Sequence, residues 1–347
     1  MNTTIAVIKF GKVWRLVEYS NYELNHLCIL PFISEDHVIT DGEIVVGVSG
    51  SSLIIIKIND YIQKGELEAV ELPSDLIVHT LCIGRKRRQA IYIGGKTQVS
   101  MFEDTEKECQ SMYYIGLNTM SYELKPFPLP DDLKKPGKAI DDVGLYMDWV
   151  YVLDDLILPK YLYIFGVKDF ELKEVLPLEV HGTYEGYLRV VINYKYIIML
   201  SGTIGDGGGG RHLTFYERES LKYLSSLSLL WSSRDIGLMS DVGPMFNDIL
   251  LIDNYLIIAA GKGGVVKLNL DQEDVLKELG LTSRDNIDKY HNYSDLFKKK
   301  YLSSPYIGDA QTIQCISKEN DSLKAVLVTV SDREVYRPEV IYISEEI

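Results

Sequence analysis

Three groups of side chains in this sequence have types and spacings that suit the binding of a charged or aromatic ligand. One is a run of four cations, one follows a Gly-rich stretch, and one mixes aromatic with basic residues. In chain order they are Arg85, Lys86, Arg87 and Arg88; Arg211 and His212; and Tyr290, His291, Tyr293, Lys298, Lys299 and Lys300. Such residue types are suited to contacts with anions or with a partner surface.

The basic run 85–88 lies between two short apolar segments, Leu81–Ile83 and Ile91–Ile93. Two strand-length segments around a polar run predict a hairpin, so the four cations should form its tip. Gathered there, they could contact an anion or an acidic partner. A charge run of this kind is also the ordinary composition of a solvated turn.

The Gly-rich stretch 205–210 directly precedes Arg211 and His212. Backbone amides in such a loop can hold a phosphate group, and these two side chains would then be the donors beside it. The stretch lacks the Gly-x-x-x-x-Gly-Lys-Ser/Thr pattern and a following helix. A flexible hairpin loop is the simpler interpretation.

The aromatic and basic residues 290–300 belong to segment 282–309, whose pattern differs from the rest of the chain. Ser283 and Ser294 are suitable N-caps for two short helices, and Pro305 would end the second. Tyrosines beside cations suit recognition of a protein partner, and also of single-stranded nucleic acid. The same aromatic residues could instead pack the two helices onto the rest of the molecule.

Residues with catalytic potential are present, but their spacing matches no catalytic motif. Paired aspartates occur at 131–132, 141–142 and 154–155, and a glycosidase needs two carboxylates about 5–10 Å apart in a cleft. Asp is also a turn former, so solvated turns are the simpler interpretation of all three pairs. The histidines form no HExxH, no Gly-x-Ser-x-Gly elbow occurs, and the cysteines form no CxxC pair. The sequence therefore predicts no catalytic residue, no metal site and no cofactor.

A repeating arrangement of strands must position these groups. Short segments rich in Ile, Val, Leu and Tyr alternate with Gly, Asp, Asn and Pro, which favours sheet over helix. Segment Val190–Gly202 matches Ile249–Gly261, and an alternating strand follows each of them. Leu-rich closing segments recur about every 50 residues, a period typical of propellers and arrays. They are Leu24–Leu30, Leu67–Leu72, Leu124–Leu129, Leu172–Leu178, Leu221–Leu224 and Val275–Leu279.

This repeat resembles the blade of a β-propeller over nearly the whole chain. The segment Ile91-Tyr92-Ile93-Gly94-Gly95 also resembles a Kelch blade, although the Trp of that family's closing half is missing. The resemblance implies an all-β propeller of about seven mostly four-stranded antiparallel blades, with six as the alternative. Residues 1–347 would form one domain, with 282–309 as a helical insertion between blades. Pairing of the N- and C-terminal strands in one blade would close the ring.

The Gly94-Gly95 pair needs a physical reason of its own within such a blade. Glycine is the residue that permits a turn with positive φ, and it is also the residue that lets two strands approach closely. We expect both effects at this pair.

The charge balance narrows the possible partners. Asp and Glu number 50 against 36 Lys and Arg, which gives a formal net charge of −14. Duplex nucleic acid and anionic membranes both require a basic face, so both are disfavoured. The N-terminus lacks the basic start and apolar run of a signal peptide, which leads us to expect a cytoplasmic protein.

The sequence favours a non-catalytic protein-interaction or scaffold propeller that binds another protein. The alternative is a propeller hydrolase or lyase that acts on a carbohydrate or small molecule in the central channel, which rests on analogy with other propellers. No feature of the sequence specifies an oligomeric state.

Overall fold

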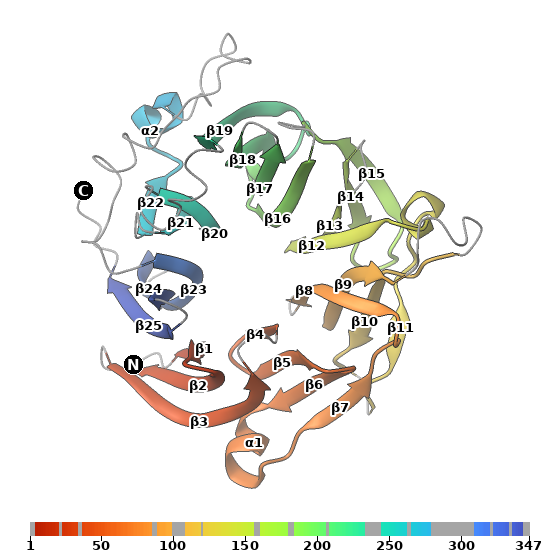
Figure 1. Ribbon diagram of the computed structural model, residues 1–347, viewed down its shortest axis with the longest axis vertical. Coiled ribbons are helices and arrows are strands. Elements are labelled where there is room, and N and C mark those ends of the chain that lie inside the picture. The colour runs from red at the N-terminus through yellow and green to blue at the C-terminus, as the bar shows by residue number, and fades with distance from the viewer. Residues whose placement is uncertain are drawn as a thin grey trace. The chain divides into compact units, whose positions relative to one another are not determined.

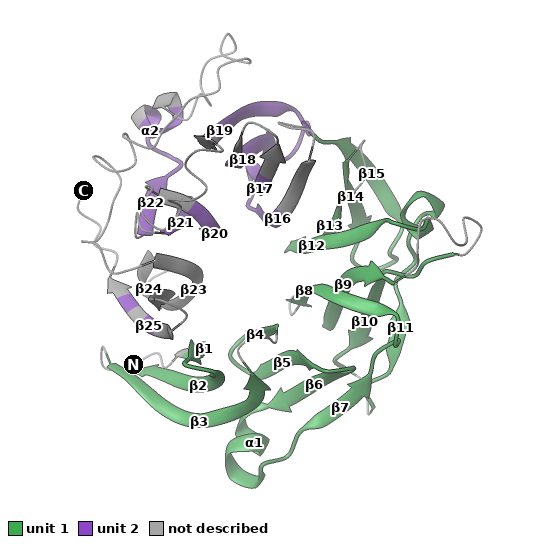
Figure 2. Ribbon diagram, viewed as in Figure 1, with its two compact units in different colours: residues 1–178 green, residues 179–347 purple. Residues whose placement is uncertain are grey.

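The computed structural model describes residues 4–20, 23–33, 37–84, 89–98, 108–118, 121–155, 160–179, 184–205, 208–232, 244–261, 265–278, 309–319, 322–332 and 335–342. Antiparallel strands dominate this part of the chain, as Figure 1 shows. The described residues form two compact units, residues 1–178 and 179–347, coloured separately in Figure 2. The helices are short, and none in the described part is long and apolar enough to cross a membrane.

The strands of unit 1 form groups in which most strands pair with the next one in sequence. The groups are β1 (Thr4–Phe10), β2 (Val13–Ser20) and β3 (Glu23–Ile33); β4 (Val38–Thr40), β5 (Ile44–Ser49), β6 (Ser52–Lys57) and β7 (Glu68–Glu71); β8 (Leu76–Gly84), β9 (Ala90–Thr97), β10 (Met112–Gly116) and β11 (Leu124–Pro126); and β12 (Ala139–Tyr146), β13 (Trp149–Asp155), β14 (Tyr161–Gly166) and β15 (Leu172–Pro177). Helix α1 (Ile58–Lys64) connects β6 to β7, and the 3₁₀ helix η1 (Asp131–Lys134) precedes β12.

Unit 2 repeats the same antiparallel arrangement. Its groups are β16 (Tyr184–Ile192), β17 (Tyr196–Gly205), β18 (Gly208–Glu217) and β19 (Tyr223–Ser232); β20 (Pro244–Ile252), β21 (Tyr255–Gly261), β22 (Val265–Asn269) and helix α2 (Glu273–Glu278); and β23 (Asp309–Glu319), β24 (Ser322–Asp332) and β25 (Val335–Tyr342). Single pairings join β9 to β12 (Lys96 with Ala139) and β21 to β23 (Gly261 with Ala310), so the number of blades stays a prediction.

The apolar cores lie where neighbouring groups pack against each other. In unit 1, Ile55 of β6 packs in one cluster with Ile91 of β9. In unit 2, Phe215 of β18 packs with Phe246 of β20. Strands in the middle of a group are covered on both faces, so β14 and β21 are almost continuously apolar and buried.

Two sequence predictions about unit 2 are wrong. Segment Val275–Leu279 was expected as a closing strand, but α2 covers residues 273–278. The Leu276 N–H donates to the Gln272 carbonyl at 3.0 Å, and Val275 is buried. The segment Glu-Asp-Val-Leu-Lys-Glu consists mostly of good helix formers, and an apolar pair such as Val275 and Leu276 can face a core from either structure.

The Gly-rich stretch is the second correction. It was expected as a flexible loop, yet β18 begins at Gly208, which pairs with Gly205 of β17. Gly210 pairs with Thr203 on one side and Leu230 on the other. Ladders on both sides override the low strand propensity of glycine.

The strands near the two ends of the chain belong to different sheets. β1 pairs with β2, and β23, β24 and β25 pair with one another in sequence order. The prediction that N- and C-terminal strands share one blade stays a prediction.

Candidate functional site

A pocket of about 390 Å³ lies in unit 1 beside the start of β8; we call it the β8 pocket. Its described lining residues are His37, Val48, Gly50, Ser51, Leu72, Pro73, Ser74, Leu76, Ile77 and Val78. They come from four separate segments, namely the start of β4, the β5–β6 turn, the β7–β8 connection and β8 itself. The volume falls within the range of roughly 300–1,000 Å³ that ligand pockets occupy.

Antiparallel pairing brings these segments to the same edge of the sheet. The end of β5, the beginning of β6 and the end of β7 meet there, and the chain then enters β8. Backbone hydrogen bonds fix the walls: Val48 N–H donates to the His37 carbonyl at 3.0 Å, and Leu72 N–H to the Ser51 carbonyl at 2.9 Å. Leu76 N–H donates to the carbonyl of Pro73 at 3.0 Å. The pocket is therefore formed by the fold itself.

Apolar and polar surface contribute about equally to the lining of the β8 pocket. Ile77 exposes 43 % of its surface, which is high for a branched aliphatic side chain. The polar side chains of the described lining are those of His37, Ser51 and Ser74, and no carboxylate is among them. Such a lining can hold an apolar group and hydrogen-bond a backbone or hydroxyl beside it.

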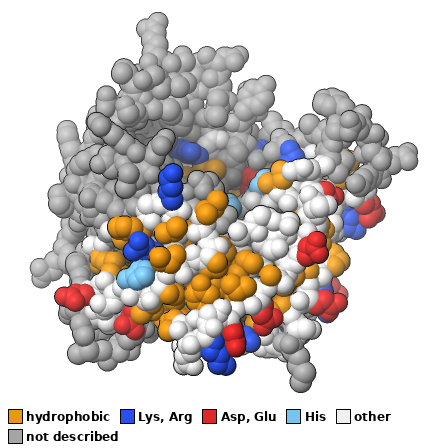
Figure 3. All heavy atoms as spheres, turned by 60° about the horizontal axis from the view of Figure 1, so that its bottom comes forward, with side chains coloured by type: hydrophobic (Ala, Val, Ile, Leu, Met, Phe, Trp, Pro, Cys, Tyr) orange, Lys and Arg blue, Asp and Glu red, His pale blue; other side chains and the backbone are white. Residues whose placement is uncertain are grey.

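Apolar side chains also gather on the face of the N-terminal strands, with charged side chains around them, as Figure 3 shows. On the outer strand β3, Ile29 and Ile33 expose more than half of their surface, and Ile62 of α1 is also exposed. The Tyr61 hydroxyl donates to the Ile29 carbonyl at 3.4 Å.

A partly buried polar cluster, which begins directly after Val78 of the pocket lining, consists of His79, Thr80, Asp141 and Asp142. His79 is an extra residue in the β8–β9 ladder, and Asp141 is an extra residue in the β12–β13 ladder. These β-bulges bend each strand and re-aim its side chains. His79 Nδ1 lies 3.5 Å from Asp141 Oδ1, and the Thr80 hydroxyl donates to Asp142 Oδ1 at 2.7 Å.

The diglycine of β9 makes room for this cluster. A Cβ atom on Gly95 would lie 2.0 Å from the carbonyl oxygen of Ile77, and one on Gly94 would lie 2.8 Å from Thr80 Cγ2. The expected close packing is confirmed. The expected positive φ is wrong, because neither glycine is among the described residues with that conformation. Gly94 and Gly95 are thus required by the bulge of β8 and by its contact with β12.

Arg211 and His212 are consecutive in β18, so their side chains point to opposite faces of the sheet. His212 is 1 % exposed, and its strand partner Ser201 is fully buried. Arg211 is partly exposed, and burial lowers the pKa of its guanidinium group. The structure therefore does not bring these two side chains together at one site.

The other basic and aromatic candidates lie outside the described residues. These are Arg85, Lys86, Arg87, Arg88, Tyr290, His291, Tyr293, Lys298, Lys299 and Lys300. The antiparallel hairpin of β8 and β9 that flanks the basic run is present. Of the expected insertion 282–309, only Asp309 is described, as the first residue of β23.

The paired aspartates differ from one another in environment. Asp131 and Asp132 are exposed in η1, as the turn interpretation predicts. Asp142 is buried in the polar cluster, and Asp154 accepts a hydrogen bond from Lys138 at 2.6 Å while fully buried. The turn interpretation is therefore wrong for the 141–142 pair and for Asp154.

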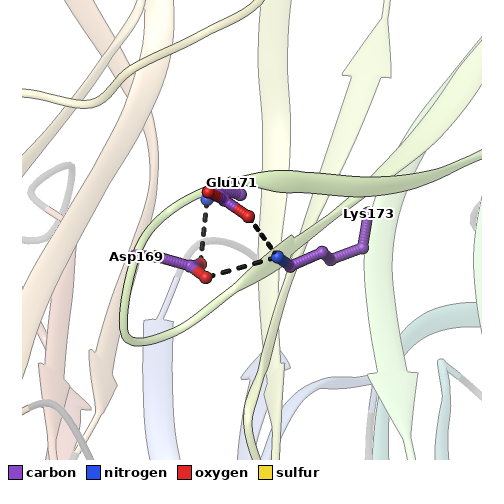
Figure 4. A network of polar contacts seen from close by, with 3 residues as sticks. All are labelled: Asp169, Glu171 and Lys173. Atoms are coloured by element: carbon purple, nitrogen blue, oxygen red, sulfur yellow. Dashed lines mark hydrogen bonds and ion pairs between the residues drawn. The ribbon is translucent and has the colours of Figure 1, made fainter.

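Three charged side chains at the β14–β15 turn form an exposed network (Figure 4). Lys173 Nζ lies 2.6 Å from Glu171 Oε2 and 3.3 Å from Asp169 Oδ2. The hydrogen bond to Glu171 is the main cause that raises the pKa of Lys173, and the Glu171 backbone N–H lowers the pKa of Asp169. Exposed pairs of this kind contribute little to stability, so we assign the network no binding role.

Sequence reasoning missed the β8 pocket and the pairing of His79 with Asp141. The pocket has no sequence signal, because its walls come from four segments. The only available signal for the cluster was Gly94-Gly95, since adjacent glycines in a strand mark a close approach of backbone. Among the described residues, no group of three or more His, Cys, Asp or Glu could hold a metal ion.

Comparison with known proteins identifies the fold. No family model and no curated protein matches this chain. Among solved structures, hydrazine synthase of Kuenenia stuttgartiensis is 12 % identical with a TM-score of 0.61, covering 95 % of this chain and 90 % of that one. The Cps50 (Swd1) β-propeller domain of Myceliophteria thermophila is 8 % identical with a TM-score of 0.55, covering 99 % of both chains.

The Dos1 propeller is similar as well, at 9 % identity and a TM-score of 0.53, covering 94 % of this chain and 76 % of that one. Identities this low carry information about the fold alone. Together with the antiparallel strand groups, they show that the chain has the β-propeller fold.

Proposed function

We propose that this β-propeller is a non-catalytic interaction module, and that it binds an extended segment of a partner protein in the β8 pocket. The observation that supports this most is a pocket with walls fixed by backbone hydrogen bonds, an exposed apolar side chain beside polar ones, and no carboxylate among its described residues. The partner segment would place one apolar side chain in the pocket.

The apolar contact supplies the affinity. Ile77 is 43 % exposed in the free protein, and the lining around it includes Leu72, Leu76 and Val78. Covering such surface contributes about 25 cal/mol for each Å² removed from water. Because the walls are already fixed, little conformational freedom is lost on binding.

The polar residues of the rim supply orientation. His37 is exposed at the start of β4, and Ser51 and Ser74 lie on the two connections that border the pocket. Their side chains can hydrogen-bond the backbone of an extended peptide, which carries a donor and an acceptor at most residues. This favours a peptide over a purely apolar small molecule.

The alternative hydrolase or lyase receives no support from the β8 pocket. Glycoside hydrolysis needs two carboxylates at the reacting bond, and the described lining has none. The two aspartates of the neighbouring polar cluster, Asp141 and Asp142, contact His79 and Thr80. A scaffold role, a cytoplasmic location and the basic run 85–88 as a second contact surface remain predictions.

A peptide-display selection on the full chain tests this proposal. Selected peptides should share an apolar anchor residue, and Ile77→Asp should weaken their binding at least tenfold, about 1.4 kcal/mol. Leu172→Asp is the matched control, because Leu172 of β15 is 40 % exposed and does not line the pocket. Equal binding by both variants, with unchanged melting temperatures, would refute the proposal.

A further inference from the structure

Three arginines of unit 2 differ in what their guanidinium groups contact. Arg189 Nε lies 3.5 Å from Asp248 Oδ1. Arg218 Nε donates to the Tyr194 carbonyl at 2.9 Å, and its Nη2 lies 3.3 Å from Glu219. Arg211 has no acceptor among the described residues, and its Nε is buried without a hydrogen bond.

A guanidinium group without acceptors is costly to bury, because it carries five N–H donors and a permanent charge. The lowered pKa of Arg211 has burial as its cause, and no described anion offsets it. Buried charges in folded proteins are generally paired with an opposite charge. The missing counter-charge can therefore come from a ligand.

A glycine lies against the guanidinium group of Arg211. Its strand partner is Gly202 of β17, and a Cβ atom there would lie 2.6 Å from Nη1 and 3.3 Å from Cζ of Arg211. The side chain thus lies directly over a residue that has no side chain. On the same face, Leu213 and Phe215 are fully buried, whereas Arg211 is partly exposed. Arg211 marks the point where this apolar face reaches the surface.

We propose that Arg211, lying over Gly202, binds an oxyanion group of a ligand. The planar fork of the guanidinium matches the paired oxygens of a carboxylate or a phosphate. The backbone of Gly208–Gly210 lies in ladders with β17 and β19, so recognition depends on the side chain rather than on a loop of free amides. This site lies in unit 2 and does not depend on the β8 pocket.

Thermal unfolding of the full chain tests this site, with inorganic phosphate, acetate and chloride compared at equal ionic strength. A ligand that binds only the folded state raises the melting temperature by mass action. We expect phosphate, acetate or both to raise it above the value in chloride, and the responding anion identifies the phosphoryl or the carboxylate class. No rise above chloride with either anion would overturn the proposal.

Substitutions of Arg211 and of the control residue Arg218 separate an effect on anion binding from an effect on the fold. Arg211→Met should abolish the anion-dependent rise and should leave the melting temperature in chloride equal or higher, because an unpaired charge is removed. Arg218→Met should lower that temperature and keep the anion-dependent rise, since this arginine has its own acceptors. A lower melting temperature of Arg211→Met in chloride, or an unchanged anion response, would overturn the proposal.

Gly202→Ala provides a second test that leaves the arginine in place. The new methyl group would collide with Nη1, the mobile end of the side chain, and would displace the guanidinium while the strand stays intact. We expect anion affinity to fall several-fold at an unchanged melting temperature in chloride. Wild-type affinity in this variant would contradict a binding position over Gly202.

Discussion

Two regions of this propeller use glycine to bring groups close together, with opposite electrostatic results. In unit 1, Gly94 and Gly95 admit the bulge of β8, and Thr80 reaches Asp142 in a buried hydrogen bond of 2.7 Å. In unit 2, Gly202 lies under Arg211, whose Nε is buried without a partner. Close packing against a glycine therefore stabilises the fold where the packed polar groups are paired with each other. Where the packed group is a charge without a partner, it indicates a ligand site.

The largest expected effect comes from Gly95→Ala. Its Cβ would lie 2.0 Å from the carbonyl oxygen of Ile77, and backbone cannot move aside without disrupting the bulge. We expect a loss of about 3 kcal/mol in the free energy of unfolding, the upper end for an overpacked site. Urea denaturation measures this loss.

Gly202→Ala is the matched substitution in the other region. The displaced atom is the end of a flexible side chain, so the free energy of unfolding should change by no more than about 0.5 kcal/mol. Similar losses in the two variants would show that the comparison between the regions is wrong.

The hydrogen bond between Thr80 and Asp142 should rank second. Asp142→Ala leaves a buried hydroxyl without this acceptor, and we expect a loss of about 1–3 kcal/mol. A double-mutant cycle with Thr80→Val isolates the pair, with a coupling energy of about 0.5 kcal/mol or more. Strict additivity of the two substitutions would mean that the side chains do not interact in solution.

The alkaline stability of unit 1 should depend on Tyr163. Burial, and next the charge of Asp154, raise the pKa of this phenol above its ordinary value. The unfolded chain therefore loses this proton near pH 10 while the folded chain keeps it, so stability falls as the pH rises above 10. The slope for one group is at most about 1.4 kcal/mol per pH unit.

Tyr163→Phe should flatten the alkaline part of the stability curve, as followed by denaturation at pH 8 to 11. The acidic and neutral parts should keep their shape. An unchanged slope above pH 10 would remove Tyr163 from this account.

The smallest effect is expected at Arg189. Its contact with Asp248 is long, at 3.5 Å, and the Arg189 side chain is 42 % exposed. Arg189→Ala should therefore cost less than about 1 kcal/mol. Arg211→Met is the direct comparison for this variant. Removing the paired arginine should lower the free energy of unfolding slightly, and removing the unpaired one should not. A loss of stability in Arg211→Met together with none in Arg189→Ala would reverse the assignment.

The sequence predicts the repeat well and its details less well. Strand-length runs of branched residues at a regular period are local signals, so most closing segments and the β8–β9 hairpin are recovered. Val275–Leu279 fails because apolar spacing alone does not separate a closing strand from a short helix. The stretch 208–210 fails because its strand conformation depends on two neighbouring strands.

The candidate site is harder to predict because its parts are distant in the sequence. The β8 pocket joins residues from 37 to 78, and the polar cluster joins 79–80 to 141–142. Each of these residues is of a common type, and its neighbours in the sequence do not mark it as part of a site. Arg211 was singled out from its Gly-rich context, but its lack of a described partner is visible only in three dimensions.

The central claim is that the β8 pocket is the site where this propeller binds its partner segment. Methyl-resolved NMR on the full chain, with a peptide from the display selection, tests it most directly. The account predicts shifts of the methyl groups of Val48, Leu72 and Ile77, with Leu172 and Val175 of β15 unchanged. Shifts at Leu172 and Val175 with an unperturbed Ile77 would contradict it.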